Sequence, residues 1–180
     1  MLKINNIEIE CVKGDITEQK DIDVIVNASN KYLAPGGGVA GAIHKKAGPK
    51  LYEECKKYAP IEVGEVVITK GYNLPNSYVI HTVGPIYSEE KNPATKLALC
   101  FKNSLKLADS KGLKSIAFPA ISTGIFGYPV EEASEVSIKA VLEVIPDLKS
   151  IKKIRFVLFD EKTYSIFTSK LEEILNSKEK

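Results

Sequence analysis

Apolar positions repeat along this chain with two different spacings, and the alternation of the two predicts an α/β fold. Residues 2–12 alternate apolar and polar positions around Asn5-Asn6, which is typical of a β-hairpin with one solvated face. Short continuous apolar runs predict buried strands, and apolar residues three or four positions apart predict helices. The expected strands are 23–26, 65–70, 78–83, 115–119 and 154–159, and the expected helices are 39–47, 51–55, 94–108, 130–144 and 164–174. Strands that alternate with helices indicate a sheet covered on both faces.

The length of 180 residues, without repeats or linkers, predicts one domain over residues 1–180. Apolar residues make up 44% and charged residues 27%, as in ordinary soluble globular proteins. No apolar run has membrane-spanning length, and the first residues do not resemble a signal peptide. Cys11, Cys55 and Cys100 are widely spaced and form no CxxC pair. They are expected to be buried thiols of a cytoplasmic protein that holds no metal and no cofactor.

Residues 27–44, NASNKYLAPGGGVAGAIH, follow an apolar strand and lead into a helix. Three consecutive glycines would let a bulky anion approach the backbone, and the helix start presents unpaired N–H groups. This pattern predicts a phosphate-binding loop, with Asn27 and Asn30 placed to bind sugar hydroxyls. A plain glycine-rich turn between strand and helix is the alternative that the pattern leaves open.

A second stretch, residues 120–129, also leaves an apolar strand, carries glycines and leads to a helix. Two such loops at neighbouring strand ends would hold a diphosphate from opposite sides. Neither loop has a lysine among its glycines, so backbone N–H groups and the Ser122 and Thr123 hydroxyls are expected to bind the anion. The net charge of +2 agrees with recognition by local geometry. A simple strand-to-helix turn again remains the alternative.

Residues 36–41, GGGVAG, also fit the GxGxxG pattern of dinucleotide-binding folds. That pattern needs its first glycine directly after the strand and an acidic residue at the end of the next strand. Here eight residues separate Asn27 from Gly36, and no acidic residue stands near Gly71. A hydride-transferring enzyme is therefore kept only as an alternative. No Gly-Lys-Ser/Thr occurs, which excludes a P-loop.

Six motifs taken together resemble the macrodomain family, in its branch of MacroD-type hydrolases, archaeal ADP-ribose binders and coronaviral macrodomains. They are GDIT (14–17), DVIVNASN (23–30), GGGVAGAIH (36–44), GEVVIT (64–69), VIHTVGP (79–85) and IAFPAISTGIFGYP (116–129). They cover nearly the whole chain in the order that the family shows. The resemblance implies a three-layer α/β/α sandwich with a central mixed sheet, and ADP-ribose in a cleft at the strand ends.

The resemblance also implies roles for individual residues. Asp15 resembles the carboxylate that accepts from the adenine amino group, with Ile16 beside it, and Phe159 resembles the ring that stacks on adenine, with Asp160 after it. Asn30 resembles the asparagine that orients the distal ribose and is needed for hydrolysis. The two phosphate-binding loops correspond to Gly36, Gly37, Gly38, Val39, Ser122, Thr123, Gly124, Ile125 and Phe126, and the Phe126 ring would also pack against the distal ribose. A Gly37→Val change is expected to crowd the diphosphate and remove most of the affinity.

Structural roles remain open for the same residues when the pattern is considered alone. Asp15 suits a turn or a helix cap, Phe159 suits the core, and Asn30 suits an Asx turn. His44 is expected to be packed or solvated, and His81, between apolar neighbours, is expected to be a structural histidine with its hydrogen bonds satisfied.

Position 40 is where the chain departs from the MacroD-type hydrolases, which carry aspartate where this chain has Ala40. Coronaviral members and archaeal binders resemble this chain there. The leading hypothesis is a hydrolase that removes mono-ADP-ribose from acidic side chains of ADP-ribosylated proteins and deacetylates O-acetyl-ADP-ribose. The alternatives are a non-catalytic ADP-ribose reader and a slow ADP-ribose-1″-phosphate phosphatase. Lys149, Lys152, Lys153 and Arg155 alternate with apolar residues, which suits a strand entry with solvated lysines. The near-neutral charge argues against nucleic acid as a partner.

Overall fold

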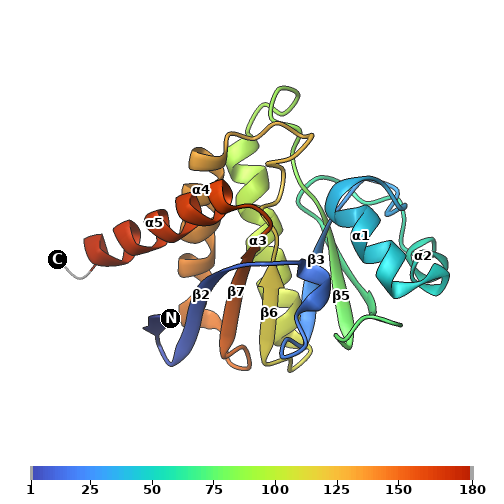
Figure 1. Ribbon diagram of the computed structural model, residues 1–180, viewed down its shortest axis with the longest axis horizontal. Helices are drawn as coiled ribbons and strands as arrows, with labels where there is room; N and C mark the ends of the chain where they lie inside the picture. The colour runs from blue at the N-terminus through green and yellow to red at the C-terminus, as the bar shows by residue number, and fades with distance from the viewer. Residues whose placement is uncertain (1, 179–180) are drawn as a thin grey trace.

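The computed structural model describes residues 2–178, which form one seven-stranded mixed sheet with helices on both faces (Figure 1). The spatial order of the strands is β1-β2-β7-β6-β3-β5-β4. The five central strands run parallel, and β1 and β4 pair antiparallel at the two edges. The strands are β1 (Leu2–Ile4), β2 (Ile7–Lys13), β3 (Val24–Ser29), β4 (Val66–Lys70), β5 (Tyr78–Val83), β6 (Ser115–Phe118) and β7 (Lys153–Leu158).

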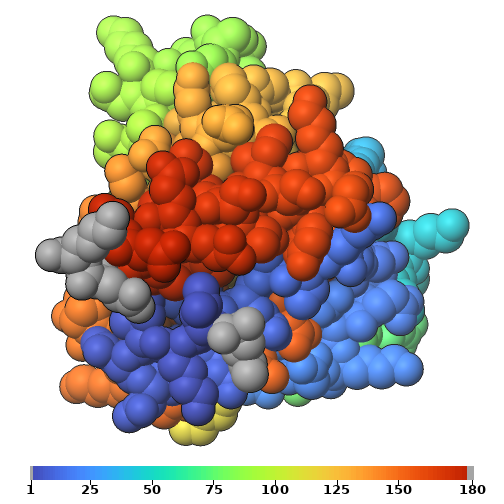
Figure 2. Space-filling model, turned by 60° about the vertical axis from the view of Figure 1, so that its left-hand side comes forward, coloured from blue at the N-terminus to red at the C-terminus, as the bar shows by residue number. Residues whose placement is uncertain are grey.

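The helices divide into two groups that cover opposite faces of the sheet. The first group is α1 (Gly38–Ala47) and α2 (Pro49–Cys55), and the second is α3 (Pro93–Ser110), α4 (Val130–Val144) and α5 (Glu161–Lys178). Two single-turn 3₁₀ helices, η1 (Ile16–Glu18) and η2 (Ile145–Asp147), lie in the connections. Figure 2 shows α5 crossing the outer surface beside the N-terminal strands, in agreement with its packing against β2. The predicted three-layer α/β/α sandwich with a mixed sheet is therefore confirmed.

The continuous apolar runs of the sequence are explained by burial on both faces of the sheet. In β3, Val24 and Val26 face the layer of α3, α4 and α5, whereas Ile25 faces α1 and α2. Among the described helices, none is both long enough and apolar enough to cross a membrane.

Two local predictions can be compared directly with the backbone. Asn5 and Asn6 both have positive φ (51° and 66°), as a two-residue type I′ hairpin turn requires, so the predicted hairpin is confirmed. The strand predicted at 23–26 is longer than expected and continues through Ser29. Asn27 therefore lies inside β3 and does not follow its end.

The parallel strands all finish at one edge of the sheet, and the loops there carry most of the predicted site residues. Because ligands of open α/β sheets bind outside the carboxyl ends of strands, this edge is the expected place for a site. The residues that follow the five strands are Gly14 after β2, Asn30 after β3, Gly84 after β5, Pro119 after β6 and Phe159 after β7.

Candidate functional site

Two adjoining cavities cross the carboxyl edge of the sheet and together form one cleft. The first, of about 420 Å³, lies between the start of α1 and the loop after β6. The second, of about 480 Å³, lies between the segment after β2 and the segment after β7. Both cavities are lined by Gly38, Val39, Ala120 and Gly124, so the cleft is continuous. The predicted residues that line it are Asp15, Ile16, Gly37, Gly38, Val39, Ser122, Thr123, Gly124, Ile125, Phe126, Phe159 and Asp160, whereas Asn27, Asn30 and Gly36 line neither cavity.

Unpaired backbone amides occur in both segments that line the first cavity. Helix α1 starts after Gly37 without a side-chain cap, and the amides of residues 38–40 donate to no described residue. On the other side, the amides of residues 124–126 also donate to no group in residues 2–178. Among the described residues, no lysine or arginine lines either cavity. Both segments therefore have unpaired N–H groups, which anion binding without a cationic side chain would require.

The two hydroxyls of the second loop are placed differently. The Thr123 hydroxyl donates to the Ala120 carbonyl oxygen at 2.8 Å and so stabilises the loop itself. Ser122 is buried, adopts the left-handed region at φ 69°, and its hydroxyl has no partner among the described residues. A non-glycine residue in this region costs about 1–2 kcal/mol, a strain that often marks functional sites.

Gly84 is a site residue that the sequence analysis missed. It lines the first cavity, and a Cβ at this position would lie 2.2 Å from the Ser122 hydroxyl oxygen and 2.7 Å from Cγ2 of Ile121. Only glycine therefore lets the loop after β6 pack against the end of β5. The available signal was the glycine directly after the apolar run of VIHTVGP, because glycine at a strand end often marks a close approach of two backbones.

The second cavity gathers Asp15, Phe159 and Asp160. Oδ1 of Asp15 accepts from the Thr17 amide at 2.8 Å and the Thr17 hydroxyl at 2.7 Å, which confirms that it caps η1. Its Oδ2 bonds none of the described residues and stays available as an acceptor. Oδ1 of Asp160 accepts from the Thr163 amide at 2.8 Å, and that bond holds the pKa of Asp160 below its ordinary value. Phe159 is 83% exposed, so it is not a core residue, and its ring is free to stack.

Asn30 braces the loop that leads from β3 to the glycines. Its Oδ1 accepts from the amides of Tyr32 and Ala34 at 3.0 and 3.1 Å, and its Nδ2 donates to the Ala34 carbonyl oxygen at 3.1 Å. The Asx turn is therefore confirmed. One Nδ2 hydrogen remains unused, and a Cβ on Gly36 would lie 3.7 Å from Nδ2. The amide thus lies beside the glycine loop.

Asn27, for which a sugar contact is predicted, lies within β3 and lines neither cavity. Asn27 is fully buried because β3 continues past it, and its side chain lies between the sheet and the α1–α2 layer. Its Nδ2 donates to the Ser29 hydroxyl at 3.0 Å and lies 3.1 Å from Nδ1 of His81. Nε2 of His81 lies 2.9 Å from the Thr69 hydroxyl, which donates to the Lys70 carbonyl oxygen. His81 is therefore a neutral structural histidine that accepts at Nδ1 and donates at Nε2, as predicted.

The free energy of unfolding should decrease as the pH is lowered, because His81 is buried in its neutral form. Burial lowers the pKa of His81 to about 3, whereas an unfolded histidine titrates near pH 6.5. Between these values the unfolded chain binds one more proton than the folded chain. The free energy of unfolding should therefore fall on acidification from pH 6.5 by up to about 1.4 kcal/mol per pH unit from this group. Burial lowers the pKa of His44 as well, which adds in the same direction.

Urea unfolding at pH values from 7 to 4 measures this dependence. The His81→Asn variant should show a shallower decrease of stability with falling pH than the parent protein. Equal slopes for the two proteins would contradict the assignment of a buried neutral imidazole.

The cysteines and acidic residues of residues 2–178 form no candidate metal site. All three cysteines are free thiols, and burial raises the pKa of Cys55 to about 12 and of Cys100 to about 11, so these thiols are poor nucleophiles. Within residues 2–178, no three His, Cys, Asp or Glu side chains gather in a group that could hold a metal ion.

Comparison with known proteins decides the family. The sequence model of the Macro domain matches residues 26–137, and full-length relatives match along nearly the whole chain. The chain belongs to the macro domain family. One relative of this macro domain is a Klebsiella pneumoniae protein named O-acetyl-ADP-ribose deacetylase. It is 45% identical over 166 residues, which cover 89% of this chain and 94% of the relative. Another is ADP-ribose glycohydrolase MACROD2 of Xenopus laevis, which is 45% identical over 92% of this chain and 40% of its own length.

Solved structures show the same fold. The Oceanobacillus iheyensis macrodomain, solved with ADP, is 40% identical and superposes with a TM-score of 0.94 over 98% of this macro domain and 96% of its own chain. A G37V variant of the Oceanobacillus protein, solved with ADPR, superposes with a TM-score of 0.92, is 38% identical, and covers 97% of each chain. A Cβ on Gly37 of this chain would have no neighbour within 4 Å among the described residues, so Gly37→Val should be tolerated by the fold, and the loss of ADP-ribose affinity expected from it stays a prediction.

Proposed function

We propose that this macro domain binds ADP-ribose along the cleft and hydrolyses esters that join ADP-ribose to an acyl group. The substrates are proteins that carry mono-ADP-ribose on acidic side chains, and O-acetyl-ADP-ribose. The observation that carries the proposal is that the two segments lining the first cavity, at the start of α1 and after β6, both carry unpaired backbone amides. Such amides bind a diphosphate without a lysine or arginine.

The rest of the ligand is oriented by the two ends of the cleft. The second cavity offers an exposed aromatic ring, Phe159, and a free carboxylate oxygen on Asp15. A ring for stacking and an acceptor for an exocyclic amino group are the two features that select adenine. The distal ribose then lies toward Phe126, Gly36 and Asn30, where the unused Nδ2 hydrogen of Asn30 is available to a sugar hydroxyl.

Hydrolysis adds water across the ester, with its OH going to the acyl carbon and its hydrogen to the ribose oxygen. No Asp, Glu or His lines the first cavity, and position 40 is a buried alanine. We therefore assign the positioning of water to the substrate's own phosphate, while Asn30 holds the ribose. Orientation of this kind is a sufficient source of rate, since it lowers barriers by roughly 7–11 kcal/mol.

A second candidate function is a non-catalytic ADP-ribose reader. Ala40 favours this function, because it stands where the MacroD-type enzymes carry an aspartate and so leaves the site without that carboxylate. The reader would share the binding geometry described above. ADP-ribosylated proteins are the proposed partners in either case. Three free thiols support a cytoplasmic location as part of the proposal.

One experiment separates the two functions. Purified protein and its Asn30→Ala variant are incubated side by side with O-acetyl-ADP-ribose and with a protein that is mono-ADP-ribosylated on glutamate. The proposal expects release of the acyl group by the parent and little release by the variant. Tight calorimetric binding of ADP-ribose with no release by either protein over hours would establish the reader instead.

Phe159→Ala should weaken ADP-ribose binding without weakening the fold. Because the ring is 83% exposed, its removal leaves no core cavity, and the midpoint of thermal unfolding should stay unchanged. Loss of one base–aromatic stack should cost about 1–3 kcal/mol, which is roughly a 5- to 150-fold loss of affinity. Isothermal calorimetry checks the affinity, and Tyr32→Ala, which removes an exposed ring outside the cleft lining, is the matched control.

A further inference from the structure

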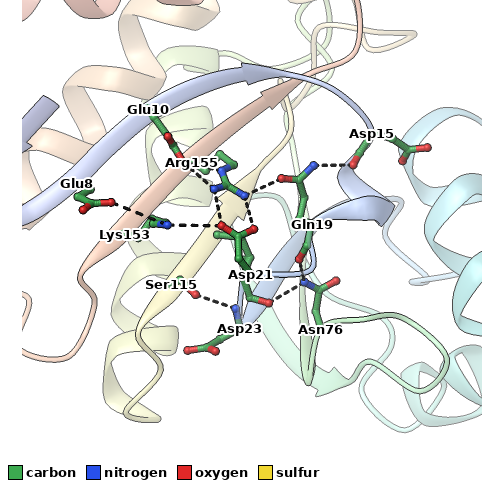
Figure 3. A network of polar contacts seen from close by, with 11 residues as sticks. Glu8, Glu10, Asp15, Gln19, Asp21, Asp23, Asn76, Ser115, Lys153 and Arg155 are labelled. Carbon is green, nitrogen blue, oxygen red and sulfur yellow. Dashed lines mark hydrogen bonds and ion pairs between the residues drawn. The ribbon is translucent and has the colours of Figure 1, made fainter. Parts of the chain in front are cut away.

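A polar network lies beside the segment that joins β2 to β3, and the buried Arg155 of β7 is at its centre (Figure 3). Nε and Nη2 of Arg155 both contact Oε1 of Glu10 at 2.8 Å. Nη1 and Nη2 bind the two carboxylate oxygens of Asp21 at 2.8 and 2.7 Å, and Nη1 also donates to Oε1 of Gln19 at 2.9 Å. All five N–H groups of the guanidinium therefore have partners.

Gln19 connects this network to the second cavity. Its Nε2 donates to the Asp15 carbonyl oxygen at 2.8 Å while its Oε1 accepts from Arg155, and Figure 3 shows the amide lying between the two residues. The other end of the segment is also held, because Nδ2 of Asn76 donates to the carbonyl oxygens of Gln19 and Ile22 at 2.7 Å each. Neither Gln19 nor Arg155 lines the cleft.

The segment needs such support because it has little regular structure of its own. Its one helical element, η1, is a single 3₁₀ turn, which is too short to fix a backbone by itself. Asp15 is exposed, yet its Oδ2 must keep a fixed position to select one base. A lysine at position 155 would not replace the arginine, since its three donors do not match the planar arrangement of acceptors around this site.

We propose that Gln19 and Arg155 are positioning residues for base recognition. They hold the Asp15 backbone through the Gln19 amide, so that the free Asp15 carboxylate oxygen meets the adenine amino group. This inference rests on the proposed function, because it requires adenine in the second cavity. It predicts that selectivity for adenine depends on side chains that touch no ligand.

The test uses Gln19→Glu, which keeps an oxygen for Arg155 and removes the N–H that donates to Asp15. Calorimetry measures the dissociation constants of ADP-ribose and of its hypoxanthine analogue, which lacks the amino group, for the parent and the variant. The preference for ADP-ribose over the analogue should fall roughly five- to tenfold in the variant, which corresponds to the free energy of one hydrogen bond. Partial unfolding would weaken the binding of both ligands equally and leave the ratio of their dissociation constants unchanged. In hydrolysis of O-acetyl-ADP-ribose, KM should rise while kcat stays the same.

Two further variants make the outcome decisive. Gln19→Met breaks both links and should lower the same ratio, whereas Lys20→Gln, on an exposed neighbour outside the network, should leave it unchanged. Arg155 itself is not replaced, because its removal would leave two carboxylates without their partner and endanger folding. A parent that prefers ADP-ribose and a Gln19→Glu variant with an unchanged ratio would overturn the inference. A parent that binds no ADP-ribose would overturn the proposed function and the inference with it.

Discussion

Asn30→Ala is expected to reduce hydrolysis of O-acetyl-ADP-ribose by about a hundredfold, as removal of one preorganised donor does in other enzymes. The affinity for ADP-ribose should fall by less than about tenfold, because the amide rows of the first cavity and the ring of Phe159 are untouched. Steady-state kinetics and calorimetry on the same preparations measure the two quantities. A variant that hydrolyses at the parental rate would exclude Asn30 from the reaction.

Asn30 also braces its own loop, so a matched variant is needed. Asn30→Asp keeps an oxygen to accept from the Tyr32 and Ala34 amides, but it removes the N–H groups, including the one that donates to the Ala34 carbonyl oxygen. If the amide acts on the ribose, both variants should lose turnover while the affinity for ADP-ribose stays within about tenfold of the parent. If Asn30 acts through the loop alone, affinity and turnover should fall together in both variants, which would refute the proposed contact.

Gly84→Ala is expected to reduce ADP-ribose affinity by roughly 10- to 100-fold, because an error of about 1 Å in the position of binding groups has effects of this size. The added Cβ would lie 2.2 Å from the Ser122 hydroxyl oxygen and 2.7 Å from Cγ2 of Ile121, so these two buried side chains must shift, and we expect the loop after β6 to shift with them. The amides of residues 124–126 would then be displaced from those of α1. Overpacking should also lower the free energy of unfolding by about 1–3 kcal/mol.

Calorimetry with ADP-ribose and urea unfolding measure the two effects of Gly84→Ala. Gly112→Ala is the control, because Gly112 has a positive φ of 75° that strains any side chain and lines neither cavity, so its replacement should lower stability and leave affinity unchanged. Equal affinities for Gly84→Ala and Gly112→Ala would show that the spacing of the two loops does not matter.

Local patterns were sufficient to predict the elements of the fold. The positive φ values of Asn5 and Asn6, and the burial of β3 on both faces, follow from short-range sequence rules that do not require knowing which distant residues pack nearby. Glycines and polar residues after apolar runs also located the loops of the cleft. These predictions succeed because turns, strand ends and helix starts are set by residues a few positions apart.

Residues whose role depends on which distant segment their side chain packs against were predicted poorly. Asn27 follows an apolar run and looks like a loop residue, yet two more residues of pairing with β5 place it inside the sheet. Arg155 looks like one cation of a surface cluster, yet the pairing of β7 with β2 and the path of the segment after β2 enclose it. In each case the deciding contact joins segments far apart in the sequence, as for Arg155 and Gln19.

The sequence by itself determined the α/β class, the family resemblance and the two glycine loops, because each depends on residues that are close together along the chain. Only the tertiary structure decided that Gly84 sets the spacing of the cleft, that Asn27 is buried, and that Gln19 joins Arg155 to Asp15. The physical reason is that steric contact and hydrogen bonding act over a few ångströms in space, whatever the separation along the chain. Which distant side chains come within that range is fixed by the order and register of the strands.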